Sequence, residues 1–192
     1  MYFKITNAKE NHNGYQYKDG LNVLYEEFDN NPDNSCAPGL HFTTKEYIHG
    51  YYGYGKFLRI IELPMEDPDF KMVKNENKYR ANKIILKDRY ELEDIETYHK
   101  FGLKYPSLIQ ASENNFINIA KHLLEIGYDD EVDKMFYCGR ALILAAKKGH
   151  LEIVKLLVEK GTDIGVDHDE PLRMALKYKH PEIIKFLRNL KN

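Results

Sequence analysis

The sequence contains no tryptophan, only two cysteines and almost no net charge, and each shortage narrows the possible functions. Cys36 and Cys138 lie far apart with no other cysteine near either, which argues against a disulfide scaffold and a clustered zinc site. We expect two reduced thiols, no metal and no cofactor. A formal net charge of -2 gives no reason for bulk attraction to nucleic acid or to a membrane. We expect neither as a partner.

Long apolar runs are also missing. No run approaches the roughly 20 residues that a membrane-spanning helix needs. Residues 1–7 contain neither the basic region nor the apolar region of a secretory signal. These observations predict a soluble, cytoplasmic protein.

The remaining composition is that of a globular protein. The 192 residues are 43% hydrophobic and 30% charged, enough for one large domain or two small ones. Most of the 15 tyrosines precede residue 105, which predicts two halves of different structure.

Residues 1–104 change pattern often. Alternation or β-branched residues predict strands at residues 3–6, 39–44, 57–63 and 79–86. Capping residues followed by apolar spacing predict short helices after Thr44 and at residues 91–101. Residues 21–28 fit a helix or a strand, and the basic positions of residues 71–83, Arg80 included, are expected in solvated loop. This half is predicted to be α+β, with four or five strands and two short helices.

Residues 141–161 form one complete helix-turn-helix pattern. Two apolar stripes flank a turn at Gly149, and Gly161 occupies the position of a helix stop. Residues 107–127 align with this unit 34 positions earlier, and residues 171–187 align with it 30 positions later. Because a unit this small cannot bury both stripes alone, the sequence predicts a stack of three units.

The segment Leu-Ile-Leu-Ala-Ala-Lys-Lys-Gly-His-Leu-Glu-Ile-Val-Lys-Leu-Leu-Val-Glu-Lys-Gly at residues 142–161 resembles the ankyrin repeat, whose period is about 33 residues. Residues 17–22, 36–44, 52–55 and 58–64 are similar to the leading domain of ankyrin repeat proteins of large DNA viruses of the mimivirus type. The resemblance implies a viral protein, acting in the host-cell cytoplasm. It also implies an α+β N-terminal domain followed by an all-α ankyrin repeat stack. The implied ranges are 1–104 for the first domain and 105–192 for the stack, with repeats at about 105–138, 139–168 and 169–192.

The resemblance further implies a non-catalytic protein-protein interaction module. On the ankyrin template, residues that follow the two small ones of each first helix face a concave groove, and the tips between copies extend that surface. The expected binding residues are Lys147, Lys148, Lys177 and Tyr178 in the groove and Lys134, Phe136, Tyr137, Asp167 and His168 at the tips; Glu113 and Asn114 stand at the corresponding groove positions of the first copy. The groove lysines predict a partner with an acidic patch. Phe136 and Tyr137 either anchor the partner or fold over the stack.

Histidines follow the inter-helix turn in two copies. In ankyrin-like units such a side chain usually bonds to backbone carbonyls of the neighbouring turn. We therefore expect structural roles for His150 and His180.

Two other classes of function stay open. The order of strand, helix and strand with a terminal carboxylate resembles ADP-ribosyltransferase-like folds, so the N-terminal domain could be such an enzyme or another nucleotide-binding enzyme. Its catalytic candidates would be His41, Tyr52 and Glu62, with the Glu62 carboxylate on the ribose. A satisfied strand histidine and a solvated edge carboxylate explain His41 and Glu62 as well. A deep pocket lined by all three would favour the enzyme, and a self-complementary surface without a cleft would favour a structural viral component.

Overall fold

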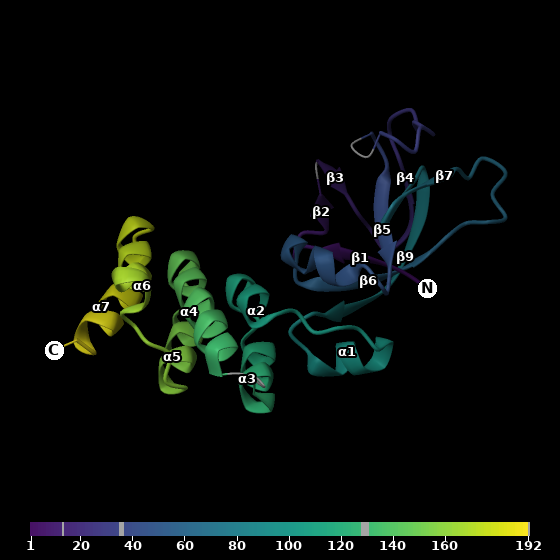
Figure 1. The fold of residues 1–192 in the computed structure, drawn as a ribbon. Coiled ribbons are helices and arrows are strands. Elements are labelled where there is room, and N and C mark those ends of the chain that lie inside the picture. The colour runs from purple at the N-terminus through teal and green to yellow at the C-terminus, as the bar shows by residue number, and fades with distance from the viewer. Residues whose placement is uncertain (13, 35–36, 128–130, 192) are drawn as a thin grey trace. The chain divides into compact units, whose positions relative to one another are not determined.

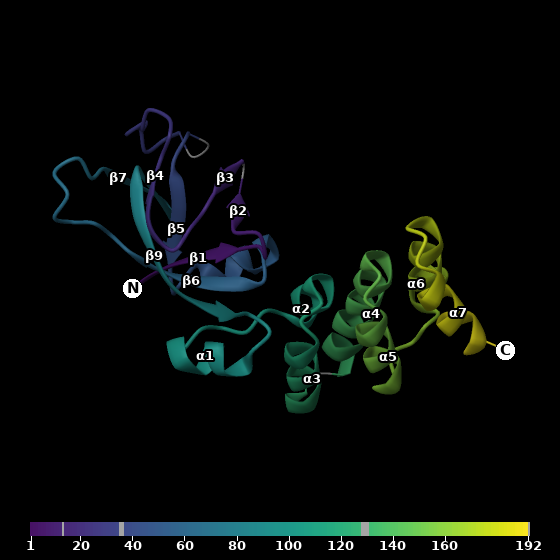
Figure 2. The same cartoon turned by 180° about the vertical axis from the view of Figure 1, so that it is seen from behind.

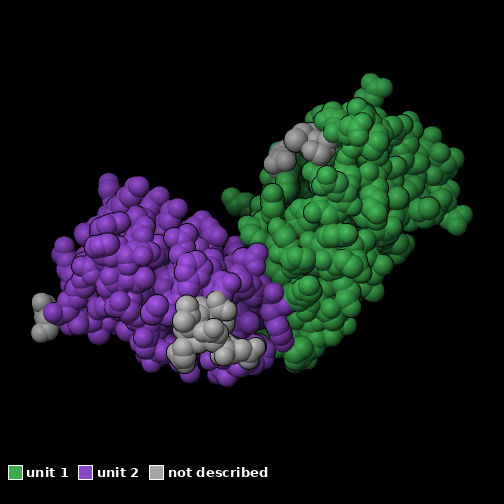
Figure 3. All heavy atoms as spheres, viewed as in Figure 1, with its two compact units in different colours: residues 1–104 green, residues 105–192 purple. Residues whose placement is uncertain are grey.

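The computed structural model describes residues 1–12, 14–34, 37–127 and 131–191, without the side chains of residues 131–134. The chain forms two compact units, Met1–Lys104 and Tyr105–Asn192 (Figure 3). These are the N-terminal unit and the C-terminal unit.

The N-terminal unit is built on an antiparallel sheet (Figure 1). Among the described residues the sheet has seven strands, in the order β4-β9-β6-β1-β5-β8-β7. Their bounds are β1 Tyr2–Thr6, β4 Gly20–Val23, β5 Leu40–Thr44, β6 Phe57–Glu62, β7 Met72–Asn75, β8 Lys78–Ala81 and β9 Lys83–Glu91. A short hairpin of β2 Asn11–His12 and β3 Tyr15–Gln16, the 3-10 helix η1 Ile48–Tyr54 and the helix α1 Ile95–Phe101 complete the unit.

The central strand β1 has a paired strand on each side and is buried along most of its length. It pairs with β6 at all five positions, but with β5 only at Tyr2↔Thr44 and Phe3↔Thr43. Apolar side chains of the neighbouring strands pack into one core cluster, formed by Tyr17, Leu40, Phe42, Ile61, Ala81, Ile84 and Leu86. The pairing of β1 with β5 stops after Phe3↔Thr43, so the remaining residues of the two strands are not paired with each other.

The prediction of four or five strands was wrong, and the causes are local. The expected strand at residues 79–86 is divided at Asn82, whose side chain donates to Asp69 O at 2.7 Å and accepts from Lys71 N at 2.8 Å. Residues 71–83, whose basic positions were expected in solvated loop, contain β7, and residues 21–28 contribute only the end of β4. The helix expected from residue 91 begins at Ile95, because the Asp94 side chain caps it.

Arg80 is fully buried, so the prediction of a solvated position was wrong. Its guanidinium donates to the carbonyls of Asp29 at 3.2 Å, Asn31 at 2.8 Å and Pro38 at 3.3 Å. It also donates to Asn75 Oδ1 at 3.3 Å. One side chain from β8 therefore satisfies carbonyls of a loop that has few apolar residues to bury.

The C-terminal unit consists of three helix pairs, and with the N-terminal sheet they confirm the predicted fold class. The first helices α2, α4 and α6 contact one another in order, and so do the second helices α3, α5 and α7 (Figures 1 and 2). The pairs are α2 Leu108–Asn114 with α3 Ile117–Ile126, α4 Glu131–Lys148 with α5 Leu151–Glu159, and α6 Val166–Lys177 with α7 Pro181–Asn189.

Each helix pair is joined by a turn with one left-handed residue. Asn115, Gly149 and Lys179 occupy this position, with φ values of 60°, 84° and 61°. At Gly149 a side chain is also excluded by space, because an added Cβ would lie 2.7 Å from Nδ1 of His180. The glycine of the middle copy thus makes room for the next copy's histidine.

One of the two tips between copies differs from the loop expected from the sequence, and the other is a turn. Residues 134–137 are not in a loop but in the first turns of α4, a helix of 18 residues. The segment assigned to the start of α6 is a left-handed turn at Asp167, His168 and Asp169, with φ values of 50°, 58° and 62°. The right-handed helix follows this turn and has Pro171 near its start, where the missing N–H costs no helical hydrogen bond.

Candidate functional site

The expected groove residues lie at the ends of the first helices and connect neighbouring copies. Together they form the groove surface, which consists of Glu113, Asn114, Lys147, Lys148, Lys177 and Tyr178. Lys148 Nζ lies 3.2 Å from Glu113 Oε1, which joins the second copy to the first. Both side chains are more than a third exposed, so this pair contributes little to stability.

Two lysines flank one aromatic ring on the groove surface. Lys147 Nζ lies 5.5 Å from the centroid of the Tyr178 ring, and Lys177 Nζ lies 5.7 Å from it. Tyr178 is 43% exposed. The structure therefore brings these three predicted residues together as a cationic and aromatic cluster, a combination that suits carboxylates and rings of a partner.

The two repeat histidines hold the backbone beneath this surface. The Nε2 atom of His150 donates to Glu113 O at 3.1 Å, and that of His180 donates to Lys147 O at 2.9 Å. The predicted structural roles of both histidines are confirmed. Each bond runs from the turn of one copy to a groove position of the preceding copy.

The aromatic residues of α4 remain accessible. Phe136 is 60% exposed, and its ring lies 5.5 Å from that of Tyr137 in an edge-on arrangement. Met135 beside it is 72% exposed. Of the two alternatives for this pair, the exposure of Phe136 fits an anchor better than a residue folded over the stack. The side chain of Lys134 lies outside the described residues.

The second tip is polar. Asp167 and His168 are exposed on the left-handed turn, and Asp169 forms an ion pair with Lys191. The left-handed turn immediately precedes the right-handed part of α6, whereas residues 134–137 form the first turns of α4, so both tips lie at the N-terminal side of a first helix.

The three candidates for an enzymatic site are not brought together. His41, on β5, lines a cavity of about 370 Å³, but neither Tyr52 nor Glu62 belongs to its lining. Tyr52 is buried in η1, and its hydroxyl donates to Lys104 O at 2.7 Å. Glu62 is exposed at the end of β6 and pairs with Lys87 at 3.0 Å. These contacts give Tyr52 a structural role and make Glu62 an ordinary solvated carboxylate at the end of a strand.

Lys4 beside His41 was missed by the sequence reasoning. It is 5% exposed, and its ammonium donates to His41 O at 2.9 Å. Burial lowers the pKa of Lys4 to about 7, and the charge of Glu10 raises it in part. No pattern in the sequence indicates this burial, because a lysine that alternates with apolar residues normally lies on the solvent face of a strand.

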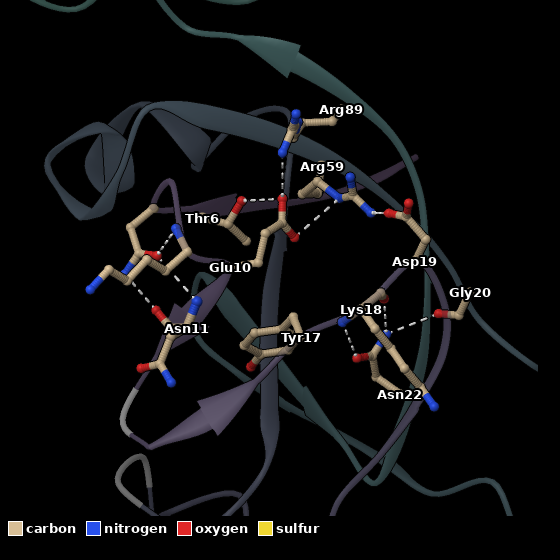
Figure 4. A network of polar contacts seen from close by, with 12 residues as sticks. Thr6, Glu10, Asn11, Tyr17, Lys18, Asp19, Gly20, Asn22, Arg59 and Arg89 are labelled. Atoms are coloured by element: carbon tan, nitrogen blue, oxygen red, sulfur yellow. Dashed lines mark hydrogen bonds and ion pairs between the residues drawn. The ribbon is translucent and has the colours of Figure 1, made fainter.

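A second polar cluster surrounds Arg59 on β6 (Figure 4). Its guanidinium forms an ion pair with Asp19, and its Nε lies 3.7 Å from Glu10 Oε2. Arg89 approaches the other oxygen of Glu10 at 3.8 Å, and Thr6 donates to that oxygen at 3.3 Å. The hydrogen bond and charge of Arg59 lower the pKa of Asp19. The cluster ties the loop before β2 and the loop before β4 to the sheet.

Over the described ranges, no three His, Cys, Asp or Glu side chains gather as a metal ion would require. Cys138 is buried in α4, and Cys36 falls outside those ranges. None of the described helices is both long and apolar enough to span a membrane.

The three stacked helix pairs, joined by left-handed turns and bonded through histidines, define an ankyrin repeat stack. A family model described as ankyrin repeats, in three copies, matches residues 108–192. Ankyrin repeat protein R868 of Acanthamoeba polyphaga mimivirus is 35% identical over 196 residues, covering 100% of this chain and 84% of that protein. The chain belongs to the mimivirus-type family of ankyrin repeat proteins.

Two further relatives from the same virus show how the family varies. Ankyrin repeat protein R896 is 39% identical over 165 residues, 84% of this chain but 42% of that longer protein. Uncharacterized protein R869 is 44% identical over 137 residues, 70% of this chain and 96% of that protein. Ankyrin repeats are a general protein-protein interaction module. Membership of the family therefore supports a general role in protein-protein interaction.

Proposed function

We propose that the C-terminal unit binds a protein partner with an acidic patch, through the groove surface and through Phe136 and Tyr137 of α4. The observation that carries the proposal is the cluster in which Lys147 and Lys177 flank the half-exposed ring of Tyr178. Lys148 already has Glu113 as a partner, so the first two lysines offer the clearer positive field. A field of this kind speeds the encounter with an acidic surface and suppresses wrong partners.

Phe136 supplies the apolar part of the same proposed interface. Aromatic side chains concentrate binding energy when a partner removes them from water. A partner that combines an acidic patch with a pocket for one aromatic ring fits both features. As part of the same proposal, the expected location is the host-cell cytoplasm, which fractionation of infected cells would test.

The test reverses charge at the cluster. The full chain and a Lys147→Glu, Lys177→Glu variant are each immobilised, and proteins from infected host cells are captured and quantified by mass spectrometry. We expect recovery of the specific partner to fall at least about tenfold, since charge reversal at a steering surface slows association. Equal melting temperatures would show that the stack remains folded.

The matched control is a Lys160→Glu, Lys185→Glu variant. It has the same change in net charge, but its two exposed lysines lie elsewhere. Lys160 is at the end of α5 and Lys185 is on α7. This variant should retain the partner. Equal loss of partner from both variants, or from neither, would contradict binding through the groove surface.

A further inference from the structure

The N-terminal unit contains a cavity that the repeat-based function does not use. Its volume is about 370 Å³, at the lower end of the range for small-molecule sites. The cavity lies where the pairing of β1 with β5 ends, after Phe3↔Thr43. Residues of η1 close it on another side, with His12 of β2 and Lys78 of β8 completing the wall.

The polar groups of this wall are basic or neutral. Lys4, Lys78, His12 and His41 line the cavity, and the described lining contains no aspartate or glutamate. Lys4 is held in place by its bond to the His41 carbonyl and by the Tyr17 ring, whose centroid lies 4.4 Å from Nζ. An ammonium has three donors, so Lys4 can offer further hydrogen bonds to a ligand.

His41 supplies an unused polar atom beside this lysine. Its Nε2 is buried and has no hydrogen-bond partner among the described residues. Such atoms are rare, because burial without a bond costs the hydration of the group. Burial, together with the charges of Lys4 and Lys78, lowers the pKa of His41 to about 3, so its ring is neutral at physiological pH. The positive charge of Lys78, and that of Lys4 in its protonated form, oppose a metal cation and favour an anion, and a bound anion would in turn favour the protonated form of Lys4.

The rest of the wall is aromatic and apolar. The rings of His12 and Tyr54 are stacked, with centroids 5.7 Å apart and planes 10° from parallel. Tyr51 lies 5.9 Å from Tyr54, and Ile48 belongs to the same wall. Flat surfaces of this kind suit a planar ring, which an inorganic anion lacks.

We propose that this cavity binds a small organic anion that carries a flat ring, with its anionic group at Lys4, a second polar group on His41 Nε2 and its ring beside Tyr51 and Tyr54. The ligand would be of mononucleotide size or smaller, as a volume of about 370 Å³ requires. The site is independent of the groove surface, because it is built entirely from the N-terminal unit.

The test separates charge from ring. Ligand-observed NMR of the full chain is run with benzoate and adenosine monophosphate, with the neutral ring compounds benzamide and adenosine, with the cation benzylamine, and with inorganic phosphate. We expect at least one of the two ring anions to bind at least about tenfold more tightly than phosphate and than its own neutral analogue. Failure of both ring anions, or equal binding of the neutral or cationic compounds, would overturn the proposal.

Variants then locate the site. Lys4→Met should weaken the bound ring anion at least about tenfold, whereas Lys87→Met, at an exposed lysine of the same unit, should leave it unchanged. Tyr54→Ala removes a ring that is 58% exposed, so it should fold, and it should reduce the preference for ring anions over phosphate. His41→Leu should weaken binding, whereas His99→Leu on α1 should not. Binding that survives both Lys4→Met and Tyr54→Ala would place the ligand elsewhere and refute the assignment.

Discussion

The buried ammonium of Lys4 should make the stability of the N-terminal unit depend on pH above neutrality. Burial lowers the pKa of this group from 10.5 to about 7. Between these two values the unfolded chain holds the proton and the folded chain does not, so the unfolding free energy rises with pH. The burial cost is fully present below about pH 7 and vanishes towards pH 10.5. By linkage its upper limit is about 5 kcal/mol.

The Lys4→Met variant removes this dependence. Relative to the variant, the wild type should gain about 2 kcal/mol of unfolding free energy between pH 7 and pH 9. At pH 7 the variant loses the bond to His41 O, worth about 1–3 kcal/mol, and a ring contact worth about 1 kcal/mol. We therefore expect it to be equal to the wild type or up to about 2 kcal/mol more stable there.

The assay is urea denaturation at pH 6, 7, 8 and 9, followed by near-ultraviolet circular dichroism, to which the tyrosine-rich N-terminal unit contributes most. The groups that face Lys4 do not interfere in this range. Burial lowers the pKa values of His12 and His41, which places both below the pH 7–9 window, and it raises the pKa of Tyr17, which places it above that window. Glu10, Lys78, Arg80 and the cross-strand neighbour Arg59 are present in both the wild type and the variant. The exposed-site variant Lys87→Met serves as control. A difference between wild type and Lys4→Met that stays constant from pH 7 to pH 9 would refute the reasoning.

Two substitutions test the other packing arguments. Gly149→Ala should lower the unfolding free energy by about 2–3 kcal/mol, because it adds left-handed strain and a clash with the His180 ring. Gly161→Ala is the control. Gly161 has a φ of 87° and open space around it, so this substitution should show the strain alone, about 1 kcal/mol. Equal losses in chemical denaturation would show that the His180 contact is not tight. Arg80→Met should cost at least about 3 kcal/mol, since it removes the four hydrogen bonds of a fully buried guanidinium. Lys74→Met at an exposed position should cost less than about 0.5 kcal/mol. A small effect of Arg80→Met in the same assay would mean that water replaces the guanidinium.

The repeat half was predictable because its determinants are local and recur. Small residues such as Ala145, a left-handed turn residue and an apolar stripe recur in each copy, so three weak signals reinforce one another. The histidine bonds followed from the same register. What failed was the tip at residues 134–137, because the first helix of the middle copy extends further back than those of its neighbours.

The N-terminal half depends on pairings between distant segments, which periodicity does not reveal. The strands at residues 3–6 and 57–63 were recognisable from their own composition. The division at Asn82 and the burial of Lys4 and Arg80 were not, since each depends on partners far away in the chain. The cavity beside His41 lies where the pairing of β1 with β5 ends, and the spacing of residues in the sequence does not predict where a strand pairing ends.

The bond from His180 to the Lys147 carbonyl has a consequence for how such arrays evolve and are engineered. A groove position belongs to one copy, but the group that steadies its backbone belongs to the next. Exchanging the third copy would therefore alter two neighbouring surfaces, its own and that of the copy before it. A protein engineer who transplants the binding face of the middle copy into another repeat protein must therefore transfer His180 as well, although it belongs to the third copy.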